Sequence, residues 1–144
     1  MLANKCGGNG VGPKVYFALA AKQDDGHCGT TRLNCDLTDV VNVCVFAARQ
    51  SDGSLGGARW DIFSPSDTTR LRKVLRVHEN PEDPVLSQNI YLSPSMLREL
   101  ALQHDIKASM FIQKQGDAVF IPAGCAHQVR CDLIFTTIDH DIEA

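Results

Sequence analysis

The sequence predicts a mainly β fold with flanking helices, and three observations carry this expectation. The apolar segments are short and rich in β-branched or aromatic residues, turn signals separate them, and two serine-proline pairs each open a segment with helical spacing. Short strands divided by turns are typical of a β-sandwich or a barrel. We therefore expect layers of strands with two helices beside them.

Length and composition indicate one globular domain over residues 1–144. The chain is 44% hydrophobic and 22% charged, which is enough apolar material for a core of its own. Its net charge of -3 argues against a free-standing nucleic-acid binder, because phosphate binding needs a surplus of basic residues. No stretch approaches the roughly 20 apolar residues of a membrane span, and we expect neither a secretory signal nor a membrane anchor.

Six cysteines occur without any C-x-x-C pair, and in an intracellular chain we expect reduced thiols. An alternative that stays open is a zinc site assembled from cysteines and histidines, although their spacings match no zinc template. Its candidate ligands are His27, Cys28, Cys35, Cys125, His127 and Cys131.

The predicted strands follow one another along the chain as short apolar runs. They are Val15–Phe17, Val40–Phe46, Trp60–Phe63, Met110–Gln113, Ala118–Ile121 and Leu133–Ile138. The fourth and fifth runs are joined by a four-residue segment containing glycine and aspartate, which favours a hairpin.

Two helices are predicted by their first residues. Ser64 and Ser93 are N-cap residues, and each precedes a proline at the first helical position. Apolar residues at helical spacing follow each start and indicate a buried stripe. A basic cluster on the first helix, comprising Arg70, Arg72, Lys73 and Arg76, is interpreted as its solvated face.

The segment from Gly116 to Val129 is the part of the sequence that points most specifically to a chemical role. It predicts a strand, a Pro-Ala-Gly turn, and then His127 where the chain enters another strand. A histidine held at a strand end after a rigid turn has little freedom to lose, which suits a metal ligand. A packed core histidine is the alternative interpretation.

A second segment places two polar residues on one face of a strand. Asn34 and Asp36 are two positions apart, so their side chains point the same way, as two ligands of one site must. The alternative for Asp36, and for Thr31 just before it, is a turn or cap hydrogen bond of the kind these residues commonly make.

Together these segments resemble the two halves of the metal site in JmjC-domain proteins, in particular the histone lysine demethylase subfamily that includes hairless. The runs Gly12–Tyr16, Gly57–Phe63 and Tyr91–Leu92 match the same family in the same order. The resemblance implies a double-stranded β-helix of the jelly-roll or cupin type. The chain is short for that family, which predicts part of a longer domain.

The resemblance also implies iron(II) held by two histidines and one carboxylate, with 2-oxoglutarate as co-substrate and oxidative demethylation as the reaction. Asp36 matches the carboxylate ligand and His127 the distal histidine. Asn34 stands where the family has its first histidine. An amide oxygen is a neutral, weak ligand, so we expect reduced affinity for iron(II).

Three further positions carry over to co-substrate binding. Thr31 and Asn42 match polar residues that line the 2-oxoglutarate pocket, whereas Thr137 stands in place of a lysine. Losing that cation would remove a charge-assisted hydrogen bond to the co-substrate. The alternative for Asn42, which lies inside an apolar strand, is a satisfied core amide.

The expected function follows from these matches and mismatches. The resemblance implies a nuclear protein that acts on a methylated histone tail or another chromatin protein, while Asn34 and Thr137 predict weak or no demethylase activity. The alternative is a catalytically inactive JmjC fold, whole or partial, that serves as an interaction module in chromatin regulation.

Overall fold

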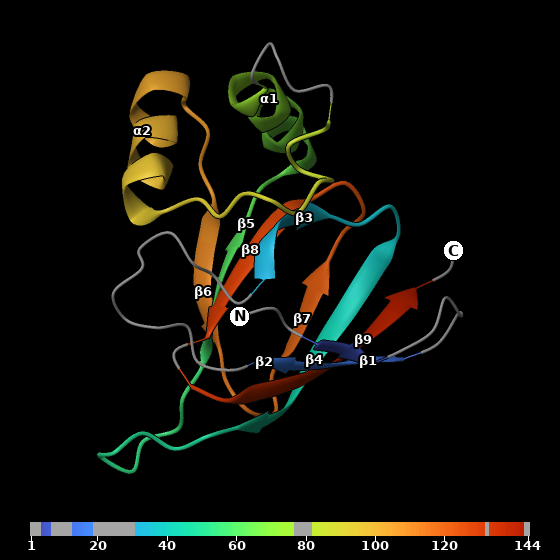
Figure 1. Ribbon diagram of the computed structural model, residues 1–144, viewed down its shortest axis with the longest axis vertical. Coiled ribbons are helices and arrows are strands. Elements are labelled where there is room, and N and C mark those ends of the chain that lie inside the picture. The colour runs from blue at the N-terminus through green and yellow to red at the C-terminus, as the bar shows by residue number, and fades with distance from the viewer. Residues whose placement is uncertain (1–3, 7–12, 19–30, 77–81, 132, 143–144) are drawn as a thin grey trace.

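A computed structural model describes residues 4–6, 13–18, 31–76, 82–131 and 133–142 of the chain. Their strands form two antiparallel sheets, and both helices lie together at one end of the sheets (Figure 1). The mainly β architecture with flanking helices that the sequence predicts is confirmed.

The first sheet has the strand order β1-β2-β9-β4-β7. Its strands are β1 (Asn4–Cys6), β2 (Lys14–Ala18), β4 (Asp39–Ala47), β7 (Ala118–Ile121) and β9 (Phe135–Ile142). Strand β9 pairs with both β2 and β4, so strands from the two ends of the chain lie next to each other. Strand β9 begins two residues later and ends four residues later than the predicted run Leu133–Ile138.

The second sheet has the order β3-β8-β5-β6. Its strands are β3 (Thr31–Cys35), β5 (Ala58–Ile62), β6 (Ser109–Gln113) and β8 (Ala126–Cys131). The pairing of β3 with β8 sets Asn34 opposite His127. Two segments that are far apart in the sequence are thereby brought to the same place in the sheet.

The predicted hairpin between Met110–Gln113 and Ala118–Ile121 is wrong. Strand β6 pairs with β5 in the second sheet, whereas β7 pairs with β4 in the first. The connecting turn is held by the first sheet, because the N–H of Gly116 donates to the Cys44 carbonyl at 2.9 Å. A glycine-containing turn permits either connection, and the choice is made by which sheet each strand can pack into.

Both helices begin where the sequence predicts. Helix α1 (Pro65–Leu75) is capped by Ser64, whose side chain accepts from the Asp67 N–H, and α2 (Pro94–His104) is capped in the same way by Ser93. Proline at the first position costs nothing there, because that N–H has no partner within the helix. The basic residues of α1 are mostly exposed, as expected.

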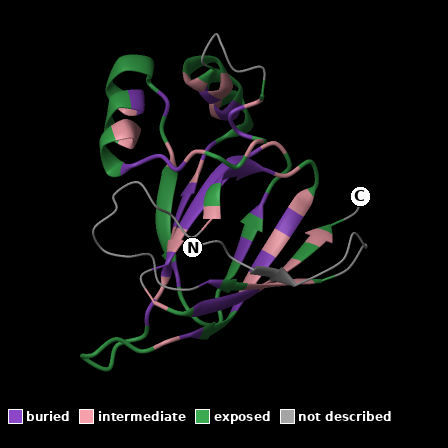
Figure 2. Cartoon of the chain, viewed as in Figure 1, coloured by how far each residue is buried: buried purple, intermediate pink, exposed green. Residues whose placement is uncertain are grey.

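The core falls into two parts. One lies between the two sheets and includes Trp60, Ile121 and Phe135; the other joins the helices to β3 and β8 and includes Leu33 and Leu71. Figure 2 shows the buried residues concentrated on the inner strands and on the helix sides that face them. The second part of the core covers the strands that carry Asn34 and His127.

The described cysteines agree with the expectation of reduced thiols. Cys35, Cys44 and Cys125 are free and buried. His27 and Cys28 of the alternative zinc site lie outside the described residues. Neither described helix is long and apolar enough to cross a membrane.

Candidate functional site

His127 is the centre of the candidate site and lies on β8, directly after the turn formed by residues 122–125. Its Nδ1 is 3.1 Å from the Cys125 carbonyl oxygen, which can only accept, so Nδ1 carries the proton. The Nε2 atom of the neutral ring then presents a lone pair. A hydrogen bond that sets the tautomer in this way is common for metal-binding histidines.

The surroundings of His127 keep its ring neutral and fixed. The side chain is buried, and the Trp60 ring stacks on it with centroids 5.8 Å apart. Burial lowers the pKa of His127, while the carbonyl of Cys125 and the Asp36 carboxylate act in the opposite direction. A neutral imidazole is the form that binds a metal ion.

Asp36 lies one residue beyond the end of β3, and its carboxylate faces the free nitrogen of His127. The distance from Asp36 Oδ2 to His127 Nε2 is 3.7 Å. The Gly124 N–H donates to the Asp36 carbonyl at 3.1 Å, which ties the two segments together. With 40% of its side chain exposed, Asp36 remains reachable from solvent.

Asn34 is the direct cross-strand neighbour of His127, and its amide is directed toward backbone. Its Nδ2 donates to the Arg32 carbonyl at 3.0 Å and to the His127 carbonyl at 3.4 Å. The residue is 7% exposed, so water does not compete freely for these bonds. The side-chain nitrogen is thus committed to the protein, and only the weak donor Oδ1 is left for a metal ion.

The fit of these residues to iron(II) is partial. A facial triad needs three donors, and the structure brings together one imidazole and one carboxylate. Within the described segments, no group of three or more His, Cys, Asp or Glu side chains is placed to hold a metal ion. His127 and Asp36 therefore fit two coordination positions, and Asn34 does not offer a third donor of comparable strength.

Asn42 belongs to a chain of buried amides that connects the two sheets. Its Nδ2 donates to Asp139 Oδ1, and its Oδ1 accepts from Gln113 Nε2 at 2.9 Å. Gln113 in turn accepts from the indole N–H of Trp60 at 2.9 Å. Both ends of the Asn42 amide are occupied, so the structure agrees with a satisfied core amide.

Asp139 is an inward-facing acid that no sequence motif singles out. It lies on β9 directly opposite Asn42 and next to Lys14 of β2. Burial, followed by the nearby Asp36 carboxylate, raises the pKa of Asp139 to about 7, although the Asn42 hydrogen bond opposes the shift. Strand alternation in 135–142 was the only signal that could have placed it inside.

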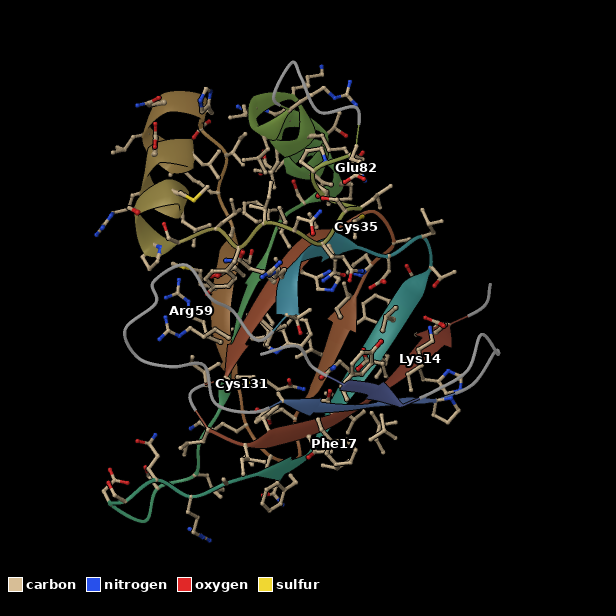
Figure 3. All side chains as sticks on the ribbon, in the orientation of Figure 1. Lys14, Phe17, Cys35, Arg59, Glu82 and Cys131 are labelled. Atoms are coloured by element: carbon tan, nitrogen blue, oxygen red, sulfur yellow. The ribbon has the colours of Figure 1, made fainter. Side chains whose placement is uncertain are left out.

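Tyr16 lies near Asp139, and neighbouring carboxylates shift its pKa as well. Burial raises its pKa to about 12, and the carboxylates of Asp139, Asp36 and Asp141 add to the shift. Lys14 is bonded to Asp141 at 2.6 Å and is partly exposed. In Figure 3 the labelled Lys14 lies beside β9, and the labelled Cys35 marks the end of β3.

These residues do not fit 2-oxoglutarate. Thr31 begins β3 opposite Val129, and both ends of the Asn42 amide are already bonded within the protein. Thr137 is buried and shares the inner face with Asp139, two positions along, so this face has a carboxyl group close to the place where the family has a lysine. Thr137 itself is uncharged, so a dianionic co-substrate would meet no cation from that position.

Trp60 is a buried core residue, and His104 and His140 are exposed. His27 and His78 lie outside the described residues.

Comparison with known proteins assigns this fold to a described family. The family described as "JmjC domain, hydroxylase" matches residues 53–136, which is more than half of the chain. That stretch contains His127 but not Asn34 or Asp36.

Curated relatives extend the match toward the amino terminus. Lysine-specific demethylase 3A-A of Xenopus laevis is 32% identical over 83% of this chain, and lysine-specific demethylase 3A of Homo sapiens is 30% identical over the same share. Lysine-specific demethylase 3 of Drosophila melanogaster is 30% identical, also over 83%. The chain spans 12% of the length of the Xenopus and human proteins and 18% of the Drosophila protein.

Proposed function

The chain belongs to the JmjC-domain hydroxylase family, and we propose that it is a member with an incomplete metal site, which binds iron(II) weakly and does not demethylate histones. Its fold is the cupin-type β-sandwich of that family, and its relatives are named lysine-specific demethylases. Iron(II) and 2-oxoglutarate dependence is a property of the family in general.

The observation that carries the proposal is the position and bonding of Asn34. It occupies the place directly opposite His127, and its Nδ2 is bonded to two backbone carbonyls. Iron(II) favours imidazole nitrogen over a neutral amide oxygen, so the third coordination position is poorly supplied. When bound by a full triad, the metal would supply the oxidising chemistry; here only His127 and Asp36 are suited to hold it.

Metal titration and a product assay together test the proposal. Anaerobic calorimetry with iron(II) should give a weak affinity that is lost in Asp36→Asn and His127→Gln, because each variant removes one of the two donors. Methylated histone peptides incubated with the chain, iron(II) and 2-oxoglutarate should release no formaldehyde. Turnover that depends on both additives, or metal affinity unchanged in both variants, contradicts the proposal.

A second candidate function is a binding module for a methylated histone tail or another chromatin protein, without turnover. The observation that favours it is that the buried polar side chains of the candidate site have hydrogen-bond partners within the protein, without a metal ion. His127, Asn34 and Asn42 each have at least one. Such a module would bind a methylated histone peptide with equal affinity in the presence and absence of iron(II). Binding that requires the metal would exclude this second function.

A further inference from the structure

We propose that the groove between helix α2 and strands β5 and β6 is a docking site for an acidic segment of a partner protein, in which Asp or Glu residues flank a bulky apolar side chain. The inference goes beyond the proposed function. The groove is lined by neither Asp36 nor His127, and binding in it requires no metal ion and no turnover.

The groove lies where α2 meets the second sheet, and its volume is about 450 Å³. A space of this size accommodates a small ligand or a few side chains. One wall is a single stripe of α2, formed by Pro94, Leu97, Arg98 and Ala101, whose spacing of three and four residues puts them on one face of the helix. Figure 1 shows α2 beside one end of β6.

Apolar side chains in and beside the groove are left uncovered by the described part of the chain. Met110 of β6 lines the groove and is 63% exposed. Among the described strands, β6 pairs only with β5, so it forms an edge of the second sheet. Ile112 lies on the same face of β6 and is 55% exposed, which extends the apolar surface along the strand. Contiguous apolar surface with a polar rim is typical of an interaction site.

The charged side chains that line the groove are all cations among the described residues: Arg59, Arg98 and Lys107. Arg98 is exposed and has no ion-pair partner in the described part of the chain. Lys107 bonds to Asp105 at 2.7 Å, but the two side chains are 70% and 76% exposed. Exposed pairs of this kind are weak, so an incoming carboxylate can take the place of Asp105.

Arg59 is oriented in advance by a buried acid. Its Nε and Nη2 donate to Asp61 Oδ1 at 3.3 and 3.2 Å, and the Asp61 side chain is only 2% exposed. The Arg59 side chain is itself 36% exposed, and its Nη1 has no acceptor among the described residues. In Figure 3 the labelled Arg59 lies beside β6. A guanidinium that is already held in place loses less entropy when it binds a carboxylate.

This combination of charge and apolar surface favours an acidic peptide over other partners. A peptide supplies carboxylates for the three cations and an apolar side chain for the cavity, whereas a nucleic-acid backbone supplies only the charge. A histone tail is rich in lysine and arginine, and the cations of the groove would repel it. The partner proposed here therefore differs in chemistry from the histone tail of the second candidate function.

Selection from a displayed library of short random peptides tests the proposal, with fluorescence anisotropy to measure the affinity of the selected peptides for the whole chain. We expect the selected peptides to be acidic and to contain at least one bulky apolar residue. In the peptide that binds most tightly, replacing the acids by glutamine, or the apolar residue by serine, should each weaken binding at least about fivefold. Added salt should weaken it as well, because it screens the charges.

Two variants with matched controls locate the binding site. Arg98→Glu should weaken binding at least about fivefold, whereas Lys73→Glu makes a comparable charge reversal at an exposed position on α1 and should leave the affinity unchanged. Met110→Gln should also weaken binding, whereas Leu86→Gln changes another exposed apolar residue, outside the groove, and should have no effect. All four positions are exposed, and thermal melts establish that each variant is folded.

Three results overturn the inference: no enrichment of any peptide, enrichment of basic or uncharged peptides, or an affinity unchanged in both groove variants. Two further results would assign the groove to a different occupant and so contradict the proposal. One is binding to phosphatidylserine vesicles or duplex DNA that is tighter than binding to the selected peptides and is lost in Arg98→Glu. The other is self-association, measured by sedimentation, that is lost in the same variant.

Discussion

At the scale of single residues, the candidate site differs from the triad that the family resemblance implies by the group at position 34. His127 presents Nε2 toward Asp36 at 3.7 Å, with its other nitrogen bonded to a carbonyl. Asn34 stands beside it with its nitrogen turned to the backbone. Asp36 and His127 thus lie close enough to serve together, while an asparagine offers a weaker donor at position 34 than the histidine implied by the resemblance would.

Asp139 leads to a prediction about stability and pH. Its pKa is raised from 3.8 to about 7, so at pH values between these two the folded chain holds a proton that the unfolded chain releases. The stability this contributes is complete below pH 3.8 and is lost as the pH rises through about 7. Asp139→Asn should therefore match the unmodified chain at about pH 4 and exceed it at about pH 8, by on the order of 1–3 kcal/mol.

Urea unfolding at both pH values measures this difference. His127 has the opposite sign, because its pKa is lowered and its stabilising effect is lost as the pH falls below 6.5, but it is present in both proteins and cancels in the comparison. A difference between the two proteins that does not grow with pH would contradict the assignment of Asp139 as a buried acid.

At the scale of elements, helix α1 helps to position the site through one buried hydroxyl. The Thr68 side chain accepts from the Ala126 N–H at 2.8 Å, directly before His127. Neighbouring α1 residues pack into the core part that contains Leu33 of β3. The helix thus supports both strands that carry the candidate ligands.

This contact predicts unequal effects for two adjacent threonines. Thr68→Val removes the acceptor and leaves the buried N–H of Ala126 without a partner, which should cost about 1–3 kcal/mol of unfolding free energy. The control Thr69→Val changes an exposed residue of the same helix and should cost well under about 1 kcal/mol. Equal losses in the two variants, measured by denaturant unfolding, would show that the hydroxyl is not the support described.

At the scale of the whole molecule, local signals predicted the helices well and the sheet pairing poorly. Ser64 and Ser93 sit at helix starts because capping depends on residues three positions away. The partner of Met110–Gln113 depends instead on a strand about 50 residues earlier, and the expected hairpin failed for that reason. No local pattern distinguishes a hairpin from a crossing between sheets.

The residues of the candidate site were likewise predicted only in part, because some of them depend on how distant strands pair. Its candidate ligands were predicted from a family resemblance, which also predicted that residues 34, 36 and 127 lie near one another, and the strand register brings these residues close together. Asp139 was missed because an acid in a mixed polar strand gives no sign of facing inward until the neighbouring strand is known. Whole-molecule topology therefore decides which polar residues reach the site.

Restoring the third donor tests the central claim most directly. Calorimetric titration of iron(II), without oxygen, into Asn34→His should show affinity more than about tenfold tighter than in the unmodified chain, because an imidazole then completes two histidines and one carboxylate. The control Thr38→His adds the same side chain at an exposed position nearby and should show no such gain. An equal affinity in Asn34→His and the unmodified chain would contradict the account of position 34 as the missing ligand.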